Sequence, residues 1–340
     1  MQFKFVDFFA WIWWFHVALS NLWGKCVSVC EIDKRASETY RLNFYEENKE
    51  LFDSGYFFED ITKLKWNEIP NHDIFCGGFP CQAFSIAWYR KGFEDNRWNL
   101  FFDIARILEK KKPQVIFLEN VKNLISHDNW NTFKTIRETL AELWYHVHFK
   151  ILNSCQYGNV PQNRERIYIV WFRDKKAFDR FQFPPKIGLE VSFRDLIEKE
   201  VDQKYYYNNS HLYPKLLEDI KNKNAVYQWR RHYVRENKMW VCPTLTANMW
   251  TGWHNVPLIL DKKWIRKMTP RETFRMQWFP NSFKLPNLAD CHLYKQAWNS
   301  VSMPVLERIW LCILHAVDPS FVTPNKLMHN FKKAEFSLAS

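Results

Sequence analysis

The sequence predicts an α/β fold in which a doubly wound, mostly parallel sheet is accompanied by a smaller second domain. In the first half of the chain, short apolar runs of strand length alternate with stretches of helical spacing, which is typical of parallel βαβ units. After about residue 184 the alternation ends, and residues 185–265 are polar, aromatic and basic. At 340 residues the chain can bury the core of one large domain and one small domain.

The expected elements follow in order along the chain. The predicted strands are the apolar runs at residues 5–9, 27–30, 74–76, 115–118 and 167–172. The predicted helices cover residues 100–109 and 132–143, where apolar side chains recur at steps of three and four. A last helix is expected after Ser302, whose hydroxyl would cap it, with Pro304 in its first turn. We expect this helix to return to the first domain.

Composition indicates the type of partner and the compartment. The formal net charge of +11 and the pI near 9.1 predict a polyanionic partner, most simply nucleic acid. The eight cysteines form no C-x-x-C pair, so we expect neither a metal site nor a disulfide framework, and a cytoplasmic location. Residues 3–19 are apolar but are interrupted by Lys4, Asp7 and His16, which predicts a buried strand and helix and no membrane span.

A cysteine-bearing loop after the strand at residues 74–76 is the first candidate for catalysis. It reads Gly-Phe-Pro-Cys-Gln, with Pro80 directly before Cys81, and Glu119 directly follows the apolar run 115–118. The carboxyl ends of neighbouring parallel strands lie at one edge of a sheet, so a thiol and a carboxyl are expected there together. This arrangement predicts covalent attack assisted by an acid.

The turn after the first strand is the second candidate, because doubly wound folds hold a cofactor loop at this place. Glu31 follows the second strand, 20 residues after Trp11, the offset at which an acidic residue binds a ribose hydroxyl. Asp60, next to Ile61, could contact an adenine edge. Taken singly, Glu31 and Asp60 would each more often be a solvated loop carboxylate.

Six segments resemble the motifs of the DNA cytosine-5 methyltransferases, in family order and through nearly the whole chain. They are Phe9-Ala10-x-Ile12, Gly78-Phe79-Pro80-Cys81-Gln82, Glu119-Asn120-Val121, Gln162-Asn163-Arg164-Glu165-Arg166, Pro270-Arg271-Glu272 and Gln296-Ala297-Trp298-Asn299-Ser300-Val301. Any one of them could arise by chance, whereas six in the right order hardly could. The resemblance implies a sheet of the S-adenosylmethionine-dependent methyltransferase type with a smaller target-recognition domain.

The resemblance also implies a mechanism. The target cytosine is flipped out of duplex DNA and attacked at C6 by Cys81, in a loop fixed by Pro80. Glu119 would contact N3 of the base, Arg166 its O2, and Arg164 would support the site. The cofactor would be S-adenosylmethionine, held by Phe9, Trp11, Ile12, Trp13, Glu31, Ile32, Asp60, Ile61, Leu100, Asn299 and Val301. The DNA contacts would include Gln82, Ser85, Arg230 and Arg231.

The same resemblance suggests domain boundaries and partners. Residues 1–184 would bind the cofactor and catalyse the reaction, and residues 185–265 would recognise the target. Residues 266–318 would carry the late motifs and the returning helix, and residues 319–340 would form a polar tail. The expected protein is a cytoplasmic monomer that acts on double-stranded DNA without a membrane, in a restriction-modification system whose cognate endonuclease acts separately.

The chain departs from the family at its glycines. Tryptophan stands at nine positions where the family pattern has glycine: 11, 13, 14, 88, 98, 250, 253, 278 and 298. The chain has 8 Gly and 18 Trp, against roughly 24 glycines at average usage. We therefore hypothesise that UGA codons for glycine were translated as tryptophan. The indoles at positions 11, 13 and 14 would fill the cofactor loop, so the literal chain is expected to bind S-adenosylmethionine poorly.

Two alternatives remain open from the sequence. One is an RNA cytosine-5 methyltransferase of the same fold, against which the long recognition segment argues. The other is a catalytically inactive DNA-binding homologue, against which the intact Cys81, Glu119 and Arg166 argue. The remaining thiols assigned to packing, as small apolar side chains, are Cys76, Cys155, Cys242, Cys291 and Cys312.

Overall fold

The computed structural model describes residues 2–12, 14–80, 100–230, 232–237, 241–245 and 257–320. The chain forms two compact units. The large unit contains the described residues up to Leu152, then Glu165–Pro184 and the described residues from Leu306 to Ser320. The small unit contains Asn153–Arg164 and Pro185–Val305. The functional boundaries expected from the sequence stay a prediction.

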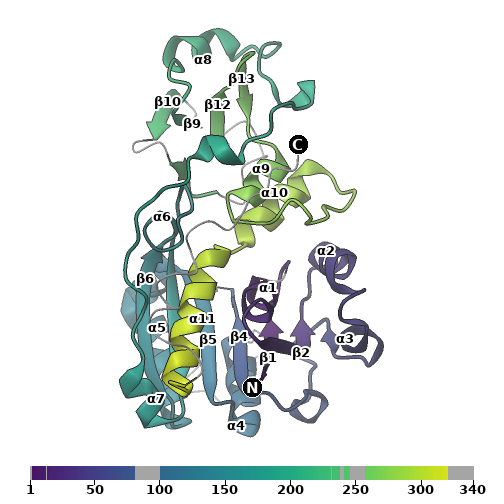
Figure 1. Cartoon of the computed structure of the whole chain (residues 1–340), viewed down its shortest axis with the longest axis vertical. Coiled ribbons are helices and arrows are strands. Elements are labelled where there is room, and N and C mark those ends of the chain that lie inside the picture. Colours follow the sequence, from purple (N-terminus) through teal and green to yellow (C-terminus); the bar gives the residue numbers. More distant parts are fainter. Residues whose placement is uncertain are drawn as a thin grey trace. The chain divides into compact units, whose positions relative to one another are not determined.

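The large unit is built on a seven-stranded sheet with the order β3-β2-β1-β4-β5-β8-β6 (Figure 1). The strands are β1 (Phe3–Phe8), β2 (Gly24–Cys30), β3 (Phe57–Phe58), β4 (Ile74–Gly77), β5 (Val115–Val121), β6 (His146–Asn153) and β8 (Glu165–Phe172). The pairs β2–β3, β1–β2, β1–β4 and β4–β5 are parallel, and β8 is antiparallel to β5. The predicted doubly wound, mostly parallel sheet is thereby confirmed, with the order of strands reversing at β1 and β4.

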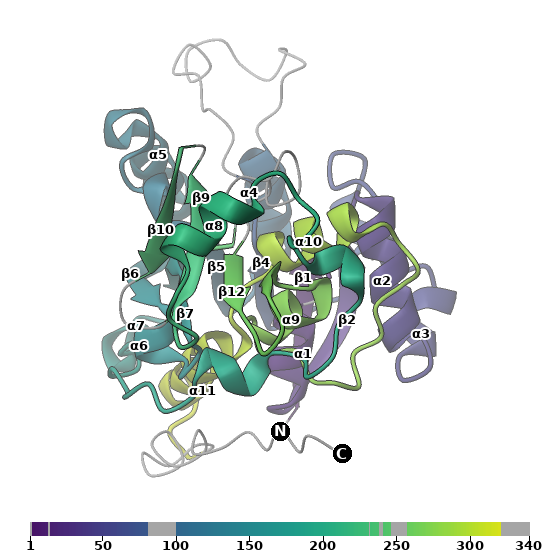
Figure 2. The same cartoon turned by 90° about the horizontal axis from the view of Figure 1, so that it is seen from above.

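Helices cover both faces of this sheet (Figure 2). They are α1 (Trp14–Ser20), α2 (Lys34–Phe44), α3 (Lys49–Asp53), α4 (Leu100–Lys111), α5 (Asn131–Glu142), α7 (Lys175–Arg180) and α11 (Met303–Val317), with 3-10 turns at Trp66–Glu68, Lys122–Leu124 and His127–Trp130. Ile116 and Leu118 of β5 lie in the cluster that α4 and α5 cover. Between them, Phe117 contacts Phe15 of α1, with ring centroids 5.0 Å apart. Successive side chains of β5 thus point to opposite, equally covered faces.

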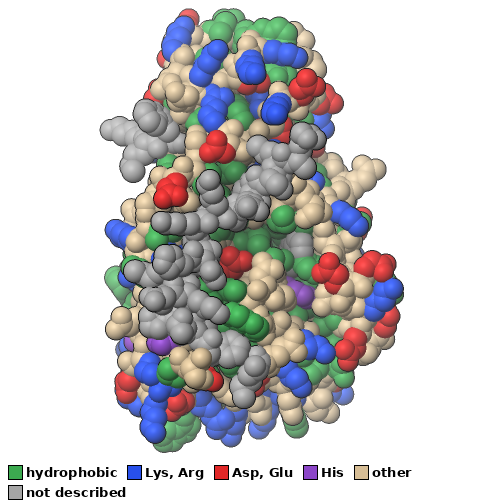
Figure 3. Space-filling view, viewed as in Figure 1, with side chains coloured by type: hydrophobic (Ala, Val, Ile, Leu, Met, Phe, Trp, Pro, Cys, Tyr) green, Lys and Arg blue, Asp and Glu red, His purple; other side chains and the backbone are tan. Residues whose placement is uncertain are grey.

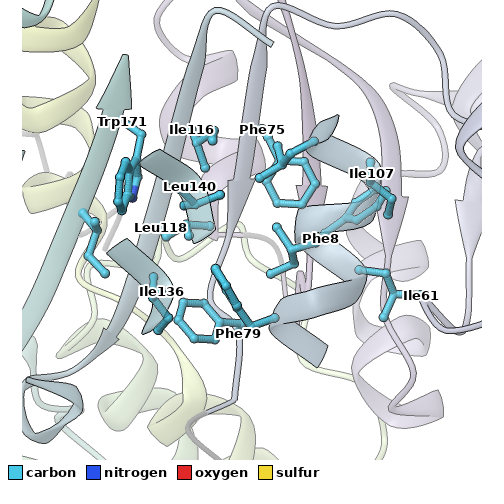
Figure 4. Close-up of a cluster of buried hydrophobic side chains, with 14 of the residues drawn as sticks. Phe8, Ile61, Phe75, Phe79, Ile107, Ile116, Leu118, Ile136, Leu140 and Trp171 are labelled. Carbon is cyan, nitrogen blue, oxygen red and sulfur yellow. The ribbon is translucent and has the colours of Figure 1, made fainter. Parts of the chain in front are cut away.

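The main hydrophobic cluster lies between the sheet and the helices α4 and α5 (Figure 4). Phe8, Phe75 and Ile116 from three neighbouring strands meet Ile107 of α4 and Leu140 of α5, all with no exposed surface. Burying one such side chain stabilises the fold by about 1.5–3 kcal/mol. The apolar runs in the sequence therefore become buried parallel strands, and the residues that follow them are held firmly at the edge of the sheet.

Two expectations need correction. Strand β6 (His146–Asn153) was not predicted, because most of its side chains are exposed or half-buried and polar residues interrupt its apolar pattern. The last helix begins at Met303, as expected, with Pro304 in its first turn. However, Ser302 does not cap it: its hydroxyl is buried and has no hydrogen-bond partner among the described residues. Ser302 instead lies against Gly158 in the small unit.

The small unit contains a four-stranded antiparallel sheet with the order β10-β9-β12-β13. Its strands are β9 (Val226–Arg230), β10 (Tyr233–Asn237), β12 (Pro257–Leu260) and β13 (Ile265–Lys267), and a separate parallel pair joins β7 (Gln162–Asn163) to β11 (Cys242–Pro243). The helices are α6 (Ser154–Tyr157), α8 (Tyr213–Asp219), α9 (Pro270–Arg275) and α10 (Asp290–Asn299), with 3-10 turns at Phe193–Leu196 and Gln203–Tyr205. A second core forms around Tyr227, Trp229, Leu258 and Leu216.

One segment, Asp290–Val317, is apolar and long enough to satisfy a test for a membrane-spanning helix. Of its most apolar 18-residue window, 78% is buried inside the protein. Burial of this extent is typical of a core helix of a globular protein, so the segment does not indicate a membrane span.

Candidate active site

The predicted nucleophile loop and the predicted acid lie at the same edge of the sheet. Strands β4 and β5 are parallel and in register, with Gly77 opposite Leu118, so Gly78 and Glu119 both follow that pair. A Cβ built on Gly78 would lie 3.5 Å from Oε2 of Glu119. The loop is described as far as Pro80, and Cys81, Gln82 and Ser85 lie outside the described residues. The acid is thus close to the start of the segment that carries the thiol.

Asn120 anchors this loop, a role that the sequence did not reveal. Its Nδ2 donates to the backbone oxygen of Phe79 at 2.8 Å, and its Oδ1 accepts from the amide of Val121 at 2.8 Å. Phe79 is buried and packs against Phe101, with ring centroids 6.0 Å apart. The two strand ends are therefore tied together two residues before Cys81, which limits where the thiol can be placed.

Glu119 forms an ion pair with Arg166, the last residue of the predicted Q-x-R-x-R motif. The distance from Nε of Arg166 to Oε1 of Glu119 is 3.0 Å, and about a tenth of each side chain is exposed. The pair spans β5 and the antiparallel β8, where Arg166 lies opposite Val121, two residues along the strand from Glu119. Such diagonal neighbours are within reach of long side chains. A carboxyl group and a guanidinium group are thus held side by side near the start of the Cys81 loop.

Arg164 serves a different purpose from Arg166. It belongs to the small unit, is 1% exposed, and its Nη2 donates to the backbone oxygens of Trp298, at 2.9 Å, and of Ser300. These carbonyls lie at the end of α10, where the late motif is found. The buried arginine therefore fixes the segment that contains Asn299 and Val301. Val301 is buried, and Nδ2 of Asn299 is buried without a hydrogen-bond partner among the described residues.

The candidate cofactor loop leaves β1 in a left-handed backbone conformation. Phe9 and Trp11 have φ angles of 58° and 50°. Glu31, at the end of β2, accepts from the amide of Trp11 at 2.7 Å through Oε2 and from the amide of Asp33 at 2.7 Å through Oε1. Its carboxylate therefore holds the loop, as well as lining a hollow of about 350 Å³ together with Ile32. Trp13 lies outside the described residues.

The other predicted cofactor residues differ in how far their side chains are buried. Asp60 is half-buried, and its carboxylate accepts from both the amide and the hydroxyl of Thr62, at 3.0 and 2.7 Å. Ile12 and Ile61 are buried almost completely, so their side chains belong to the core and only their backbone could meet a ligand. Leu100 is half-buried and opens α4.

A cluster of buried polar side chains near the candidate cofactor loop was not predicted from the sequence. Asp7 is fully buried in β1 and accepts from the amide of His16 at 3.2 Å, and Nδ1 of His16 lies 2.5 Å from the hydroxyl of Tyr40. Burial raises the pKa of Asp7 and lowers the pKa of His16 to about 3. Burial thus disfavours the charged form of both side chains, which suits a structural support for the start of α1. For Asp7 the nearby Glu31 adds to this effect, whereas the bond from the His16 amide opposes it.

Several other thiols are poor nucleophiles in this fold. Burial raises the pKa of Cys30, Cys76 and Cys242, and it raises the pKa of Cys312 to about 12. The thiolate is the reactive form, so these side chains are inert at neutral pH. This agrees with the assignment of Cys76, Cys242 and Cys312 to packing. Cys155 is only half-buried, and its thiol donates to Oδ1 of Asn153.

The predicted recognition segment has a basic surface and an aromatic core. On the face shown in Figure 3, lysine and arginine side chains are spread over the upper part of the molecule. Arg230 is half-buried at the end of β9, whereas Arg231 lies outside the described residues. Trp229 is 5% exposed and belongs to the core of the small unit, with Nζ of Lys215 5.1 Å from its ring. This tryptophan therefore packs rather than stacks on a base.

Among the residues described, no cluster of three metal-ligating side chains occurs.

The comparisons with known proteins decide the family. The family model of C-5 cytosine-specific DNA methylases matches residues 3–315. The chain belongs to this family. The type II methyltransferase M.Bsp6I of Bacillus sp. is 51% identical over 284 residues, which cover 82% of this chain and 88% of that protein. M.HhaI of Haemophilus parahaemolyticus is 38% identical over 321 residues, covering 90% and 92%. The cytosine-5 methylase described here is thus a DNA methyltransferase of the type II restriction-modification group.

Solved structures show the same fold for this methylase. The Dnmt2 methyltransferase of S. pombe superimposes with a TM-score of 0.70 at 20% identity, covering 93% of this chain and all of the other. A putative DNA modification methyltransferase encoded within an E. coli prophage gives a TM-score of 0.65 at 18% identity, covering 93% and 98%. The predicted fold class is therefore confirmed.

Proposed function

We propose that this methylase modifies C5 of one cytosine within a specific duplex DNA sequence, through a covalent bond between Cys81 and C6 of the base. The observation that carries the proposal is that Glu119 and Arg166 lie at the edge of the sheet where Gly78 begins the segment that leads to Cys81. In the proposed mechanism the target base is flipped out of the duplex, because C5 and C6 cannot be reached within the stack. The sulfur–carbon bond then makes C5 nucleophilic.

The roles proposed for the acid and the arginines are those that the family resemblance implies, and the contacts of these residues are compatible with them. Glu119 is proposed to share a proton with N3 of the base, which lets the ring accept the electron pair as Cys81 attacks. Arg166, beside Glu119, is proposed to donate to O2 of the base and to orient the carboxyl group. Pro80 and the Asn120 anchor would place the thiol, and Arg164 would hold the late motif. Removal of the C5 proton after methylation then breaks the bond to Cys81.

S-adenosylmethionine is the proposed cofactor, and the residues present fit it in part. The buried amide Nδ2 of Asn299 lacks a partner among the described residues, and the Glu31 carboxylate stands beside a hollow with Ile32. The proposed binding set also includes Phe9, Ile12, Asp60, Ile61, Leu100 and Val301. When bound, S-adenosylmethionine supplies the methyl group. The side chain of Trp11 leaves the same loop, so binding by the literal chain is expected to be weak.

The partner is proposed to be double-stranded DNA, contacted by Gln82, Ser85, Arg230 and Arg231. We propose that the protein acts as a cytoplasmic monomer and protects DNA from a separately acting endonuclease. The relatives support DNA as the substrate, since they are type II DNA methyltransferases.

The test uses purified protein, labelled S-adenosylmethionine and mixed-sequence duplex DNA or tRNA in parallel. Label on DNA at C5 of cytosine, abolished in Cys81→Ser, supports the proposal, and sequencing of the modified positions identifies the target. A covalent complex with 5-fluorocytosine DNA should form with the unaltered protein and not with Cys81→Ser. Label on tRNA alone would favour the RNA alternative. Because the literal chain carries the indoles, a second preparation with glycine at positions 11, 13 and 14 is assayed beside it.

A further inference from the structure

We propose that the functional polypeptide carries glycine at positions 11, 23, 130, 144 and 278, where this sequence has tryptophan. Ten residues other than glycine in the described part of the chain have φ between 50° and 75°, and five of them are these tryptophans. Positive φ occurs in only a few per cent of residues that carry a Cβ, and it is rarer still for bulky ones. Positions 23, 130 and 144 lie outside every motif that pointed to missing glycines, so the backbone supplies independent evidence. The inference does not depend on the proposed reaction.

The end of α5 shows what the backbone requires. The amide of Trp144 donates to the oxygen of Ala141 at 2.9 Å, and the amide of Tyr145 donates to the oxygen of Leu140 at 3.2 Å. These two bonds define a Schellman motif, with Trp144 as the left-handed residue just beyond the helix at a φ of 67°. Leu140 and Tyr145 are both buried, as the motif's hydrophobic contact requires. Glycine is the usual residue at this place because it has no Cβ.

The end of α9 repeats the pattern. The amide of Trp278 donates to the oxygen of Arg275 at 2.8 Å, and the amide of Phe279 donates to the oxygen of Phe274 at 3.2 Å. Trp278 has a φ of 75°, and the rings of Phe274 and Phe279 are in contact with centroids 4.8 Å apart. This is the same motif with the same hydrophobic pair. Two helices therefore end on an indole in the position that favours glycine.

A third helix in the same chain provides the reference. After α3, the amide of Gly55 bonds the oxygen of Phe52 at 3.4 Å, and the amide of Tyr56 bonds the oxygen of Leu51 at 3.1 Å. Gly55 has a φ of 76°, nearly identical to that of Trp278. At this third helix end, the sequence itself has glycine at the left-handed position of the same motif.

The exposure of the indoles supports the same conclusion. Trp144 is 83% exposed, Trp130 61% and Trp23 41%, so much of each ring is outside the core. Trp229 and Trp310 are the contrast: each is buried, neither has positive φ, and Nε1 of Trp310 donates to the oxygen of Leu22 at 3.0 Å. These two packed tryptophans therefore differ from the three exposed ones in both burial and backbone conformation.

The test compares thermal unfolding of Trp144→Gly with that of Trp144→Ala, in the full chain. Both variants lose the indole, but only glycine relieves the left-handed backbone, so we expect Tm of Trp144→Gly to exceed that of Trp144→Ala by about 2–4 °C. The reverse change, Gly55→Trp, should lower Tm, and the matched control Trp310→Gly should lower it further because it opens a cavity. Equal Tm values for the glycine and alanine variants would overturn the proposal.

A second measurement remains decisive even if the variants fold poorly. The gene should encode positions 11, 23, 130, 144 and 278 by UGA and Trp229 by UGG, and peptides from the native host should have glycine masses at the five positions. UGG codons at positions 23, 130 and 144 would contradict the inference.

Discussion

Two arginine–glutamate pairs, one in each unit, differ in how completely the protein encloses them. Arg266 and Glu272 of the small unit have no exposed side-chain surface, and they are joined by two bonds of 2.9 and 2.7 Å. Arg266 also pairs with Asp261 at 2.8 Å. Glu119 and Arg166 of the large unit make one contact of 3.0 Å and stay about a tenth exposed.

The difference separates a structural pair from a pair that can meet a substrate. All three side-chain nitrogens of Arg266 donate to protein acceptors, and Glu272 also accepts from the amides of Glu198 and Thr269. This explains the Pro-Arg-Glu motif: its glutamate connects α9 to β13. The Glu119–Arg166 pair is about a tenth exposed and lies near Gly78, at the start of the predicted nucleophile loop, which is compatible with the proposed contact to a flipped base. Predictions that separate activity from stability test this distinction.

The largest expected effect is on activity, from Glu119→Gln. The amide keeps the shape of the side chain but cannot deliver a proton to N3, so methyl transfer should fall about 100- to 10,000-fold, while Tm changes little. Initial rates with labelled cofactor and thermal unfolding measure the two quantities. Glu165→Gln is the control, because the side chain of Glu165 is 40% exposed and its carboxylate pairs with Lys122. A loss of Tm as large as the loss of activity would contradict the assignment.

The second effect is on stability, from Glu272→Gln. The change removes one of the two carboxylates that pair with the fully buried Arg266 and leaves Asp261 as the other, which should cost up to about 3–5 kcal/mol in free energy of unfolding. Denaturant titration measures it, with Glu218→Gln on the exposed face of α8 as the control. A cost below about 1 kcal/mol, which is typical of an exposed ion pair, would contradict the structural role of Glu272.

A third prediction concerns acid sensitivity in the large unit. The pKa of His16 is lowered to about 3 by burial, from 6.5, so the unfolded chain binds a proton that the folded chain does not. Stability should therefore fall as pH drops below 6.5, by about 1.4 kcal/mol per pH unit from this residue until its folded pKa is reached. His16→Phe should reduce the slope of the unfolding free energy against pH, between pH 6 and pH 4, by about 1.4 kcal/mol per pH unit. His232→Phe, at an exposed position, is the matched control for a His-to-Phe change.

The smallest effect is expected from replacing the whole buried pair. Arg266→Met combined with Glu272→Leu removes both charges together, so the double variant should be destabilised by clearly less than Glu272→Gln alone. Denaturant titration of Arg266→Met, of Glu272→Leu and of the double variant completes the double-mutant cycle. Additive costs would show that the two side chains act independently.

Much of the fold was predictable because buried parallel strands carry continuous apolar runs. The strands around Val29, Phe75, Phe117 and Ile169 were identified in this way. Strand β6 was not predicted because its side chains are mostly exposed or half-buried, and the expected cap by Ser302 is absent because its hydroxyl is buried without a hydrogen-bond partner among the described residues. The candidate site was predictable in residue type and order, whereas the anchor from Asn120 to Phe79 was not, since it joins residues 41 positions apart.

The sequence by itself indicated the family, the order of the elements and Cys81, Glu119 and Arg166 as the candidate catalytic residues, because motif order and apolar periodicity are local properties. Only the tertiary structure decided that Glu272 pairs with Arg266, that Arg164 holds the end of α10, and that burial shifts the pKa of Asp7 and of His16. These depend on burial and on partners far along the chain. The tertiary structure also revealed Trp23, Trp130 and Trp144 as left-handed positions, because a φ angle is a property of the folded backbone and cannot be read from the residue name.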